Sequence, residues 1–307
     1  MKRVLIVVIL IIGAAVLGLW RSQGGVRAGL NRVISGSREK NSAGATGDET
    51  RKTFDLKPGA HVEIQGVNGS VEIQTSDTKT AEVYVRRSAD NPTSLGRREL
   101  TIEQTSDGFV VRSRQNHVGL WEHLFGKDPK EEVTIKAPRQ IALSVRGVNG
   151  RVNSGIIEGA LEIRGVNGRV EVEQAGDSGE VSGINGSIAV GLKQLSERGL
   201  RISGVNGGIE LKLSSGLNAD LNAHGMNGSV RSEIVDVTVD RQDSWSRYSA
   251  HIGKGGPAIE INGINGNVRL TRLDGGPSSA SSNVPDKNAA QNQAPEKGAT
   301  SAPKSAQ

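Results

Sequence analysis

The sequence predicts an all-β solenoid in which short strands stack as repeating units. The first observation is the tetrapeptide Gly-(Val/Ile/Met)-Asn-Gly, which occurs seven times. The second is its spacing: successive first glycines are 81, 18, 18, 21, 21 and 38 residues apart, and a period near 20 is typical of stacked units. The third is an alternation of apolar residues on both sides of the tetrapeptide. The copies begin at Gly66, Gly147, Gly165, Gly183, Gly204, Gly225 and Gly263.

Apolar residues recur at fixed positions around each copy. When the first glycine is numbered zero, they lie at −4 and −2, at +1, and at +5 and +7. In the third copy these residues are Leu161, Ile163, Val166, Val170 and Val172. Alternation with a period of two predicts a short strand on each side of the tetrapeptide. Asn-Gly forms the turn between the strands, because both residues adopt positive φ at little cost.

Two architectures fit this pattern, and the residue at +1 distinguishes them. In an Asn-Gly hairpin the strands would pair antiparallel, and the +1 residue would point away from the core. In a parallel solenoid the tetrapeptide is a corner between two sheets, and the +1 residue points inward. This residue is large and apolar in every copy, which favours the solenoid. The equivalent asparagines would then form a structural ladder at the strand spacing of ~4.8 Å. They are Asn68, Asn149, Asn167, Asn185, Asn206, Asn227 and Asn265.

The N-terminal segment predicts a membrane anchor. Met1-Lys2-Arg3 precedes 17 residues, from Val4 to Trp20, that include no charge and no proline. This length is the lower limit for a membrane-spanning helix and exceeds the apolar part of a usual signal peptide. We therefore expect residues 1–20 to be an uncleaved signal anchor that contacts the membrane through residues 4–20. Signal cleavage is the alternative.

Three further segments follow the anchor. Residues 21–52 are rich in Gly, Ser, Arg and Asn, and are expected to be a basic flexible linker. Residues 53–274 hold the repeats and are expected to form the β-solenoid domain. Residues 275–307 lack periodicity and are expected to be a disordered tail.

The two long spacings predict departures from the regular stack. The 81-residue gap contains four alternating segments, at residues 81–86, 100–104, 109–114 and 132–137, which are expected to cap the starting end of the solenoid. The 38-residue gap is interpreted as two units of about 19 residues with a protrusion around residues 240–256.

The charge distribution argues against nucleic-acid binding. The net charge is +5, but residues 1–52 carry nine Lys/Arg and three Asp/Glu, whereas residues 53–274 carry 26 and 28. The basic excess therefore lies beside the apolar segment, and the body has no surplus with which to bind phosphates. The chain has no cysteine, which excludes disulfides and thiolate zinc sites.

The repeats of this chain resemble those of a known group of bacterial proteins. The Gly-Ile/Val-Asn-Gly repeats are similar to those of the adhesin-like families that comprise the auto-transporter adhesin head GIN domain and the DUF4097 β-strand repeats. The similarity covers about residues 53–274, including Phe54–Gly59, Ala137–Arg139 and Gly253–Pro257. The resemblance implies a right-handed, single-stranded parallel β-helix of the pectin-lyase-like kind, usually exported. It implies no catalytic residue.

The sequence predicts no catalytic, cofactor-binding or metal-binding residue. Gly176-Asp177-Ser178-Gly179 matches the surroundings of a serine-protease nucleophile, but it lies at a turn between repeats and lacks the other features of that fold. His117 and His123 are six residues apart, which fits neither a helical nor a strand metal site well. Glu162 and Glu180 would stack on adjacent units, but no aspartate cluster joins them as a calcium site of a polysaccharide lyase would require.

Two surfaces are candidates for ligand binding. Arg146, Arg151, Arg164 and Arg169 occupy outward positions on adjacent units, so they could form a basic patch beside the asparagine ladder. The ligand would be an acidic envelope glycan or another envelope protein. The alternative is a solvated face in which Glu162 and Glu171 neutralise the arginines. The second candidate is the segment 117–125, whose Trp121 and Phe125 are more simply interpreted as a cover for the end of the core.

We therefore expect an exported, membrane-tethered β-solenoid of the bacterial cell envelope that has no enzymatic activity and serves as an adhesin-like binding or spacing element. Its body would lie outside the cytoplasmic membrane, or would be periplasmic or secreted if the signal is cleaved. The alternatives are a polysaccharide-active β-helix enzyme and an envelope-stress sensor that transmits through the N-terminal helix.

Overall fold

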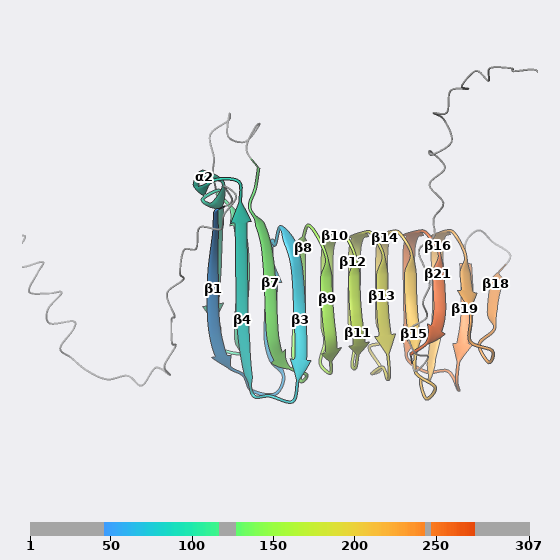
Figure 1. Ribbon diagram of the computed structural model, residues 1–307. Helices are drawn as coiled ribbons and strands as arrows, with labels where there is room; N and C mark the ends of the chain where they lie inside the picture. The colour runs from blue at the N-terminus through green and yellow to red at the C-terminus, as the bar shows by residue number, and fades with distance from the viewer. Residues whose placement is uncertain (1–45, 117–126, 243–246, 274–307) are drawn as a thin grey trace, which may run out of the picture. The chain divides into compact units, whose positions relative to one another are not determined.

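The computed structural model describes residues 46–116, 127–242 and 247–273, and it is an all-β structure with two large mixed sheets (Figure 1). Sheet A contains, in spatial order, β1 (Thr46–Asp55), β4 (Thr80–Ala89), β7 (Lys130–Pro138), β3 (Gly69–Ser76), β9 (Val152–Ile157), β11 (Val170–Ala175), β13 (Ile188–Leu192), β15 (Ile209–Leu213), β21 (Val268–Arg272) and β17 (Val230–Ser232).

Sheet B contains β18 (Val239–Gln242), β19 (Arg247–Ile252), β16 (Ala219–Asn227), β20 (Ala258–Asn265), β14 (Leu200–Asn206), β12 (Gly179–Asn185), β10 (Leu161–Asn167), β8 (Ile141–Val148), β2 (Ala60–Gln65), β6 (Gly108–Gln115) and β5 (Arg98–Gln104). One short helix, α2 (Pro92–Leu95), lies near the N-terminal end of the sheets (Figure 1).

Each tetrapeptide joins a strand of sheet B to a strand of sheet A, and we call this pair of strands a repeat unit. In the third copy β10 precedes the tetrapeptide and β11 follows it. β10 pairs parallel with β8 and β12, and β11 pairs parallel with β9 and β13. The rejected hairpin would have paired residues 62–65 with 71–74, but β2 and β3 belong to different sheets.

The corner of the unit depends on glycine at both ends of the tetrapeptide. In the third copy Gly165 has a φ of 65° and Gly168 a φ of 153°, and L side chains rarely adopt either conformation. A Cβ atom on Gly168 would also collide with the carbonyl oxygen of Gly150 in the preceding unit. Glycine is therefore required here by backbone conformation and by the close approach of adjacent units.

The core lies between the two sheets and is filled by the alternating apolar residues. The +1 residue is buried in every copy, with exposed fractions from 1% at Val166 to 5% at Met226, so the predicted inward direction is confirmed. Each fully buried Val, Ile or Leu side chain contributes roughly 1.5–3 kcal/mol, which explains how a chain with few aromatics forms a stable core. At the N-terminal end Phe54 and Phe109 stack with their ring centroids 4.7 Å apart.

The N-terminal end confirms the four segments predicted in the long gap, because β4, β5, β6 and β7 cover them and lie beyond the first repeat unit. Several pairs here are antiparallel: β1 with β4, β4 with β7, and β5 with β6. The prediction that residues 21–52 form a linker is wrong at its C-terminal end. β1 begins at Thr46, because residues 46–52 pair with β4 and complete sheet A.

At the C-terminal end the prediction for the 38-residue gap is wrong. Residues 258–272, with β20 and β21, lie between β14–β15 and β16–β17, so the last two repeat units are not stacked in sequence order. We call residues 258–272 the inserted unit and residues 219–232, with β16 and β17, the end unit. The predicted protrusion is instead an antiparallel hairpin, β18 and β19, which extends sheet B beyond β16.

The predicted membrane segment (residues 4–20), residues 21–45 of the linker and the tail (residues 275–307) lie outside the described residues. So does the segment 117–125. In the ranges that the structure describes, no helix is long and apolar enough to cross a membrane.

Candidate binding surfaces

The seven tetrapeptide asparagines lie in one row along the corner between the sheets. Each except Asn68 donates a hydrogen bond from Nδ2 to Oδ1 of the next asparagine toward the N-terminal end of the stack, at 3.0–3.2 Å. The order of the row is Asn68, Asn149, Asn167, Asn185, Asn206, Asn265 and Asn227. Because the amides bond to one another, they stabilise the stack.

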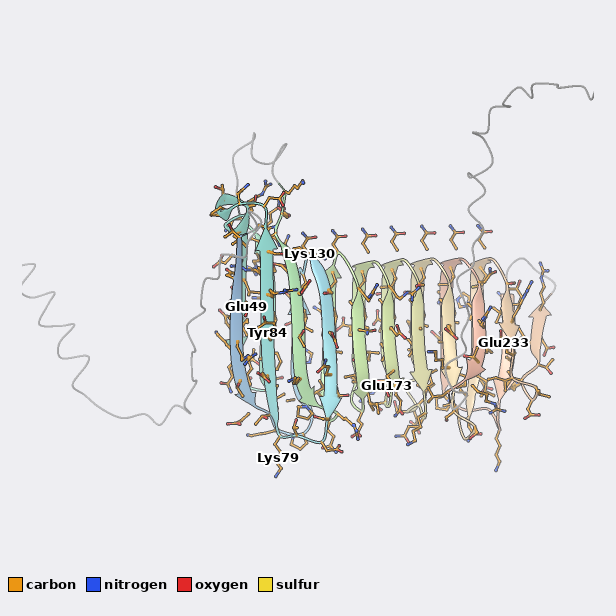
Figure 2. The ribbon with its side chains drawn as sticks, viewed as in Figure 1. Glu49, Lys79, Tyr84, Lys130, Glu173 and Glu233 are labelled. Atoms are coloured by element: carbon orange, nitrogen blue, oxygen red, sulfur yellow. The ribbon has the colours of Figure 1, made fainter. Side chains whose placement is uncertain are left out.

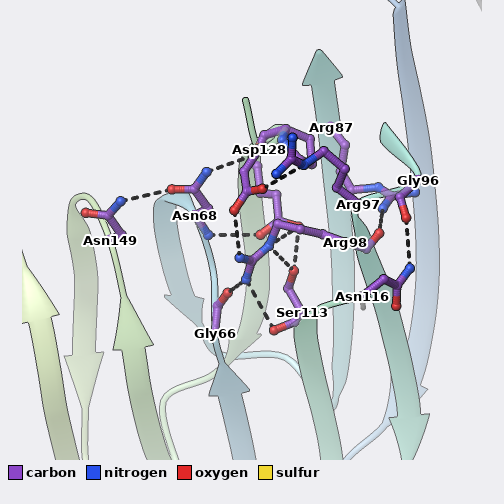
Figure 3. Close-up of polar contacts among 12 residues, drawn as sticks. Gly66, Asn68, Arg87, Gly96, Arg97, Arg98, Ser113, Asn116, Asp128 and Asn149 are labelled. Atoms are coloured by element: carbon purple, nitrogen blue, oxygen red, sulfur yellow. Dashed lines mark hydrogen bonds and ion pairs between the residues drawn. The ribbon is translucent and has the colours of Figure 1, made fainter. Parts of the chain in front are cut away.

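A buried polar network ends the ladder (Figure 3). Asn68 Nδ2 donates to the carbonyl of Pro129 at 3.0 Å, and the Asn68 backbone N–H donates to Glu131 Oε2 at 2.9 Å. Glu131 is fully buried and accepts a second hydrogen bond from Ser113 Oγ at 2.6 Å. Arg98 supplies the compensating positive charge, with Nε 3.7 Å from Glu131 Oε1.

Arg98 also joins this network to the first tetrapeptide and to the cap. It donates to the carbonyl of Gly66, and its Nη1 is 3.6 Å from Asp128 Oδ2 (Figure 3). Arg97, which is nearly buried, approaches the other Asp128 oxygen at 3.3 Å. The network therefore pairs charged groups where regular stacking stops, although Arg97 Nε and Asp128 Oδ1 contact each other as an ion pair without a hydrogen bond. Sequence reasoning missed it, because Arg98, Ser113 and Glu131 lie far apart in the chain and belong to no motif.

Arg146 and Arg164 lie opposite each other on β8 and β10, on the outer face of sheet B. Glu162 bridges them: its carboxylate lies 2.8 Å from Arg146 Nη2 and 2.8 Å from Arg164 Nε. Glu63 lies 3.7 Å from Arg146, and Glu180 lies 2.8 Å from Arg164. These five residues form a row of alternating charge, in which both arginines already have carboxylate partners.

The two arginines of the row lower the pKa of its central member, Glu162. Burial alone would raise the pKa of the Glu162 carboxyl, but hydrogen bonding to Arg146 and the charges of Arg146 and Arg164 outweigh burial, so the pKa lies below its usual value of 4.5. The hydrogen bond to Glu162 also raises the pKa of the Arg146 guanidinium. Both shifts favour the charged forms of Glu162 and Arg146, whose charges are directed at each other.

Arg151 and Arg169 lie on the other side of the asparagine ladder, immediately before β9 and β11 of sheet A. Both side chains are exposed, and neither makes an ion pair or side-chain hydrogen bond to a described residue. Their units are adjacent, since the Val152 N–H donates to the carbonyl of Arg169 at 2.9 Å. The structure thus divides the predicted patch into two pairs on two sheets, of which only Arg151 and Arg169 have guanidiniums available for an anion.

The outer face of sheet A has two open hollows beside this pair. One, of 360 Å³, lies over β13, where Ser187 and Ala189 have small outward side chains, and Arg169, Glu171 and Lys212 are among the residues that line it. The other, of 470 Å³, lies over β9 and is lined by Glu72, Glu171 and Glu173, the last of which is labelled in Figure 2. These hollows are open to solvent, unlike the enclosed apolar pockets of small-molecule sites.

The residues weighed for catalysis do not form a reactive arrangement in the described part of the chain. Ser178 donates to the neighbouring Asp177 carboxylate at 3.4 Å, and no described histidine bonds to it. Glu162 and Glu180 do lie opposite each other, but arginines hold both of them. The described residues include no cluster of three or more potential metal ligands, and His117 and His123 lie outside them.

The sequence did not predict one titratable pair at the C-terminal end, His251 and Asp220. His251 Nδ1 lies 2.6 Å from Asp220 Oδ1, and the backbone N–H of Gly256 donates to Asp220 Oδ2 at 3.1 Å. The Gly256 hydrogen bond, followed by that of His251, lowers the pKa of the Asp220 carboxyl below its usual value. The pair fixes the connection from β19 to β20.

No family model and no curated protein matches this chain. Its structure is similar to a candidate cell adhesion protein from Clostridium sporogenes, with 12% identity and a TM-score of 0.39, over 73% of this chain and 99% of that one. It is similar to a candidate adhesin from Parabacteroides merdae, with 12% identity and a TM-score of 0.26, over 73% and 96% of the two chains. A candidate lipid-binding protein from Parabacteroides distasonis has 11% identity and a TM-score of 0.26, over 73% and 97%. Similarities at this level carry no argument about function.

Proposed function

We propose that this protein is a non-enzymatic binding element of the bacterial cell envelope, whose β-solenoid body is exported and tethered to the membrane by residues 4–20. The body would bind an extended acidic glycan of the envelope along the outer face of sheet A. The availability of Arg151 and Arg169 carries this proposal, because two exposed guanidiniums on adjacent units face solvent and pair with no carboxylate of the described residues.

The shape of the surface supports an extended ligand rather than a compact one. Units repeat at the strand spacing of about 4.8 Å, so the face presents equivalent positions along the stack. The hollow beside Arg169 is lined by small side chains such as Ala189 and by residues of several units, among them Glu171, Ile209 and Arg269. A polymer that lies across several units could therefore reach both arginines and the polar groups of the hollow.

The fold that we propose for the body is a right-handed, single-stranded parallel β-helix of the adhesin-like group with DUF4097 and GIN repeats. Parallel in-register pairing of successive units, such as β10 with β12 and β11 with β13, supports this assignment. The repeated tetrapeptide supports the family assignment. In this fold the body also serves as a rigid spacer, which is compatible with binding.

A binding assay on glycan arrays tests the proposal and separates the two arginine pairs. The full chain and two double variants, Arg151→Ser with Arg169→Ser and Arg146→Ser with Arg164→Ser, are applied to acidic and neutral glycans. We expect the first variant to lose binding to acidic glycans and the second to keep most of it. Added salt should weaken binding by the native chain, because ions screen exposed charges over about 10 Å at 0.1 M.

Each rival function has its own signature in these experiments. Release of shorter glycans by the purified protein would establish a polysaccharide-active enzyme and contradict our proposal. If both double variants lose glycan binding equally, all four arginines contribute to the binding site. Binding that is indifferent to salt and to both variants would rule out an arginine-dependent site. An envelope-stress sensor would instead require a partner on the cytoplasmic side of the anchor.

A further inference from the structure

The inserted unit occupies a slot between two units that precede it in the chain. β20 pairs parallel with β14 on one side and with β16 on the other, so Ile259 lies opposite both Leu200 and Leu221. β21 lies in the same way between β15 and β17. The inserted unit therefore completes both sheets at once, although it is the last unit of the chain.

The contacts in this slot are the ones that any repeat unit offers to its neighbours. Ile259, Ile261 and Ile264 are at most 1% exposed and fill the core between the two flanking units. Asn265 donates to Asn206 and accepts from Asn227, each at 3.0 Å, like every interior asparagine of the ladder. Nothing in these contacts distinguishes the chain's own unit from the same unit of a second copy.

The connection to the inserted unit, which we call the hinge, is short and rich in glycine. Residues 253–257 join β19 to β20, and Gly253 and Gly255 adopt φ of 62° and 76°. Side chains of the end unit and the residues before it hold this connection: Asn218 Oδ1 accepts from the Lys254 N–H at 2.8 Å, and Asp220 binds Gly256. The five residues can span up to about 20 Å when extended, whereas crossing β16 requires only about 10 Å. The hinge is therefore longer than its present path across β16 requires, so β20 and β21 could move away from the slot while the chain stays connected.

We propose that the inserted unit is exchanged between two copies of this chain, so that in a reciprocal dimer the slot of each copy is filled by β20 and β21 of the other. Exchange of an identical element is a low-cost route to a dimer, because it breaks and forms the same contacts. The slot stays empty until β20 and β21, the last strands of the body, have folded into it. During that period a second copy of the chain can fill the slot with its own β20 and β21. The inference goes beyond the proposed glycan binding and does not depend on it.

Concentration decides which arrangement predominates. The chain's own unit is tethered by five residues and has a high effective concentration, so a dilute chain fills its own slot. Exchange increases when copies are held close together, as they would be if the N-terminal segment anchors them in one membrane. The dimer would then place two bodies in fixed contact through their C-terminal ends.

Single-cysteine variants test the exchange directly, because the chain has no native cysteine. Ser203 and Asn262 lie opposite each other on β14 and β20, at the strand spacing of about 4.8 Å that a disulfide can bridge. Full chains with either Ser203→Cys or Asn262→Cys, one of them carrying a mass tag, are unfolded together, refolded at rising concentration and oxidised. We expect a cross-linked heterodimer whose yield rises with concentration.

A matched pair of variants supplies the control. Ser182 and Ser203 also lie opposite each other, on β12 and β14, but their units are adjacent in sequence and no exchange is proposed there. Chains with Ser182→Cys mixed with chains with Ser203→Cys should give only the cross-linking that random collision produces. An equal yield from the two mixtures would overturn the proposal.

A second measurement keeps the test decisive if a variant folds poorly. Light scattering on the refolded native chain should detect a dimer that grows with concentration. The chain with both Ser203→Cys and Asn262→Cys, oxidised when dilute, should close an internal disulfide and then remain monomeric at every concentration. A native chain that stays monomeric after concentrated refolding, or a locked chain that still dimerises, would contradict the exchange.

Discussion

The middle repeat units and the C-terminal units are made from the same sequence pattern but are assembled differently. Between β8 and β15 each unit stacks on the unit that precedes it in the chain, and sequence order equals spatial order. At the C-terminal end the inserted unit separates two consecutive units, and β17, with three residues, is the last strand of sheet A. The pattern thus specifies the unit and its register, while the order of the units depends on the connections.

The same comparison shows where the stack is weakest. Val166 has an apolar neighbour on each side, Val148 and Ile184. Met226, at the equivalent position of the end unit, has Ile264 on one side, and no described strand pairs with it on the other. Stability in a stacked array is nearly a sum of unit and interface contributions, so the end unit should be the first to open.

The largest expected effect is that of a charge at the inward corner of a middle unit. Val166→Asp buries an unpaired carboxylate between two apolar residues and should lower the free energy of unfolding by about 4 kcal/mol or more. Met226→Asp should cost less, because Met226 has a stacked apolar neighbour, Ile264, on one side and no strand partner among the described residues on the other. Urea denaturation of both variants measures the difference.

The outward neighbour Arg164 provides the control for the interior site. Arg164→Asp lies on the exposed face of the same strand and should cost less than about 1 kcal/mol. If Val166→Asp and Arg164→Asp lower the urea midpoint equally, the inward and outward faces of the unit have been assigned wrongly. If Met226→Asp costs as much as Val166→Asp, the end unit is not the weaker one.

The next effect concerns glycine at the corner. Gly168→Ala places a Cβ against the carbonyl of Gly150 and forces an L residue into a conformation that only glycine adopts readily, so it should cost more than about 2 kcal/mol. Gly216 has open space around it and no positive φ. Gly216→Ala should change stability by no more than about 0.5 kcal/mol. Thermal denaturation with equal shifts for the two variants would refute a steric requirement at the corner.

Much of the regular stack could be predicted because each feature is local. The spacing of 18–21 residues, the apolar alternation and the inward +1 residue all follow from one unit, and the middle units agree with them. The position of the inserted unit could not be predicted in this way. Either Asn265 or Asn227 could follow Asn206 in the ladder, because the two copies of the tetrapeptide have the same register. Five residues connect β15 to β16, no more than a sequential stack would need.

The positions of the four arginines in the basic patch were predictable, but their ion pairing was not. Outward positions follow from the alternation, and all four arginines are indeed exposed. Their division follows from the corner, which places Arg146 and Arg164 on one sheet and Arg151 and Arg169 before strands of the other. Whether an arginine is paired depends on the residues beside it on its own strand and on the adjacent strand. Glu162 contacts both arginines of the first pair, whereas no carboxylate of the described residues binds the second.

A smaller effect distinguishes interior and terminal members of the asparagine ladder. Asn167→Ala removes two side-chain hydrogen bonds, to Asn149 and from Asn185, and should cost about 1–2 kcal/mol. Asn227→Ala removes the one bond to Asn265 and should cost about half as much. Urea denaturation compares the two variants. A greater loss at Asn227 would mean that the end unit depends on the ladder more than the middle units do.

The smallest effect is electrostatic and can be isolated by pH. Glu162→Gln removes the bridge between Arg146 and Arg164 and should cost less than about 1 kcal/mol at neutral pH, because exposed ion pairs contribute little. The folded pKa of Glu162 lies below 4.5, so its stabilisation is fully present above that value and is lost as the pH falls through the lowered pKa. The native chain and the variant should therefore converge in stability in acid. Glu260, which pairs with the single arginine Arg201 at 2.7 Å, provides the comparison at the inserted unit, and Glu260→Gln should cost less than Glu162→Gln at neutral pH. If the difference between the native chain and Glu162→Gln is constant across the acid range, the carboxylate does not stabilise the row through its charge.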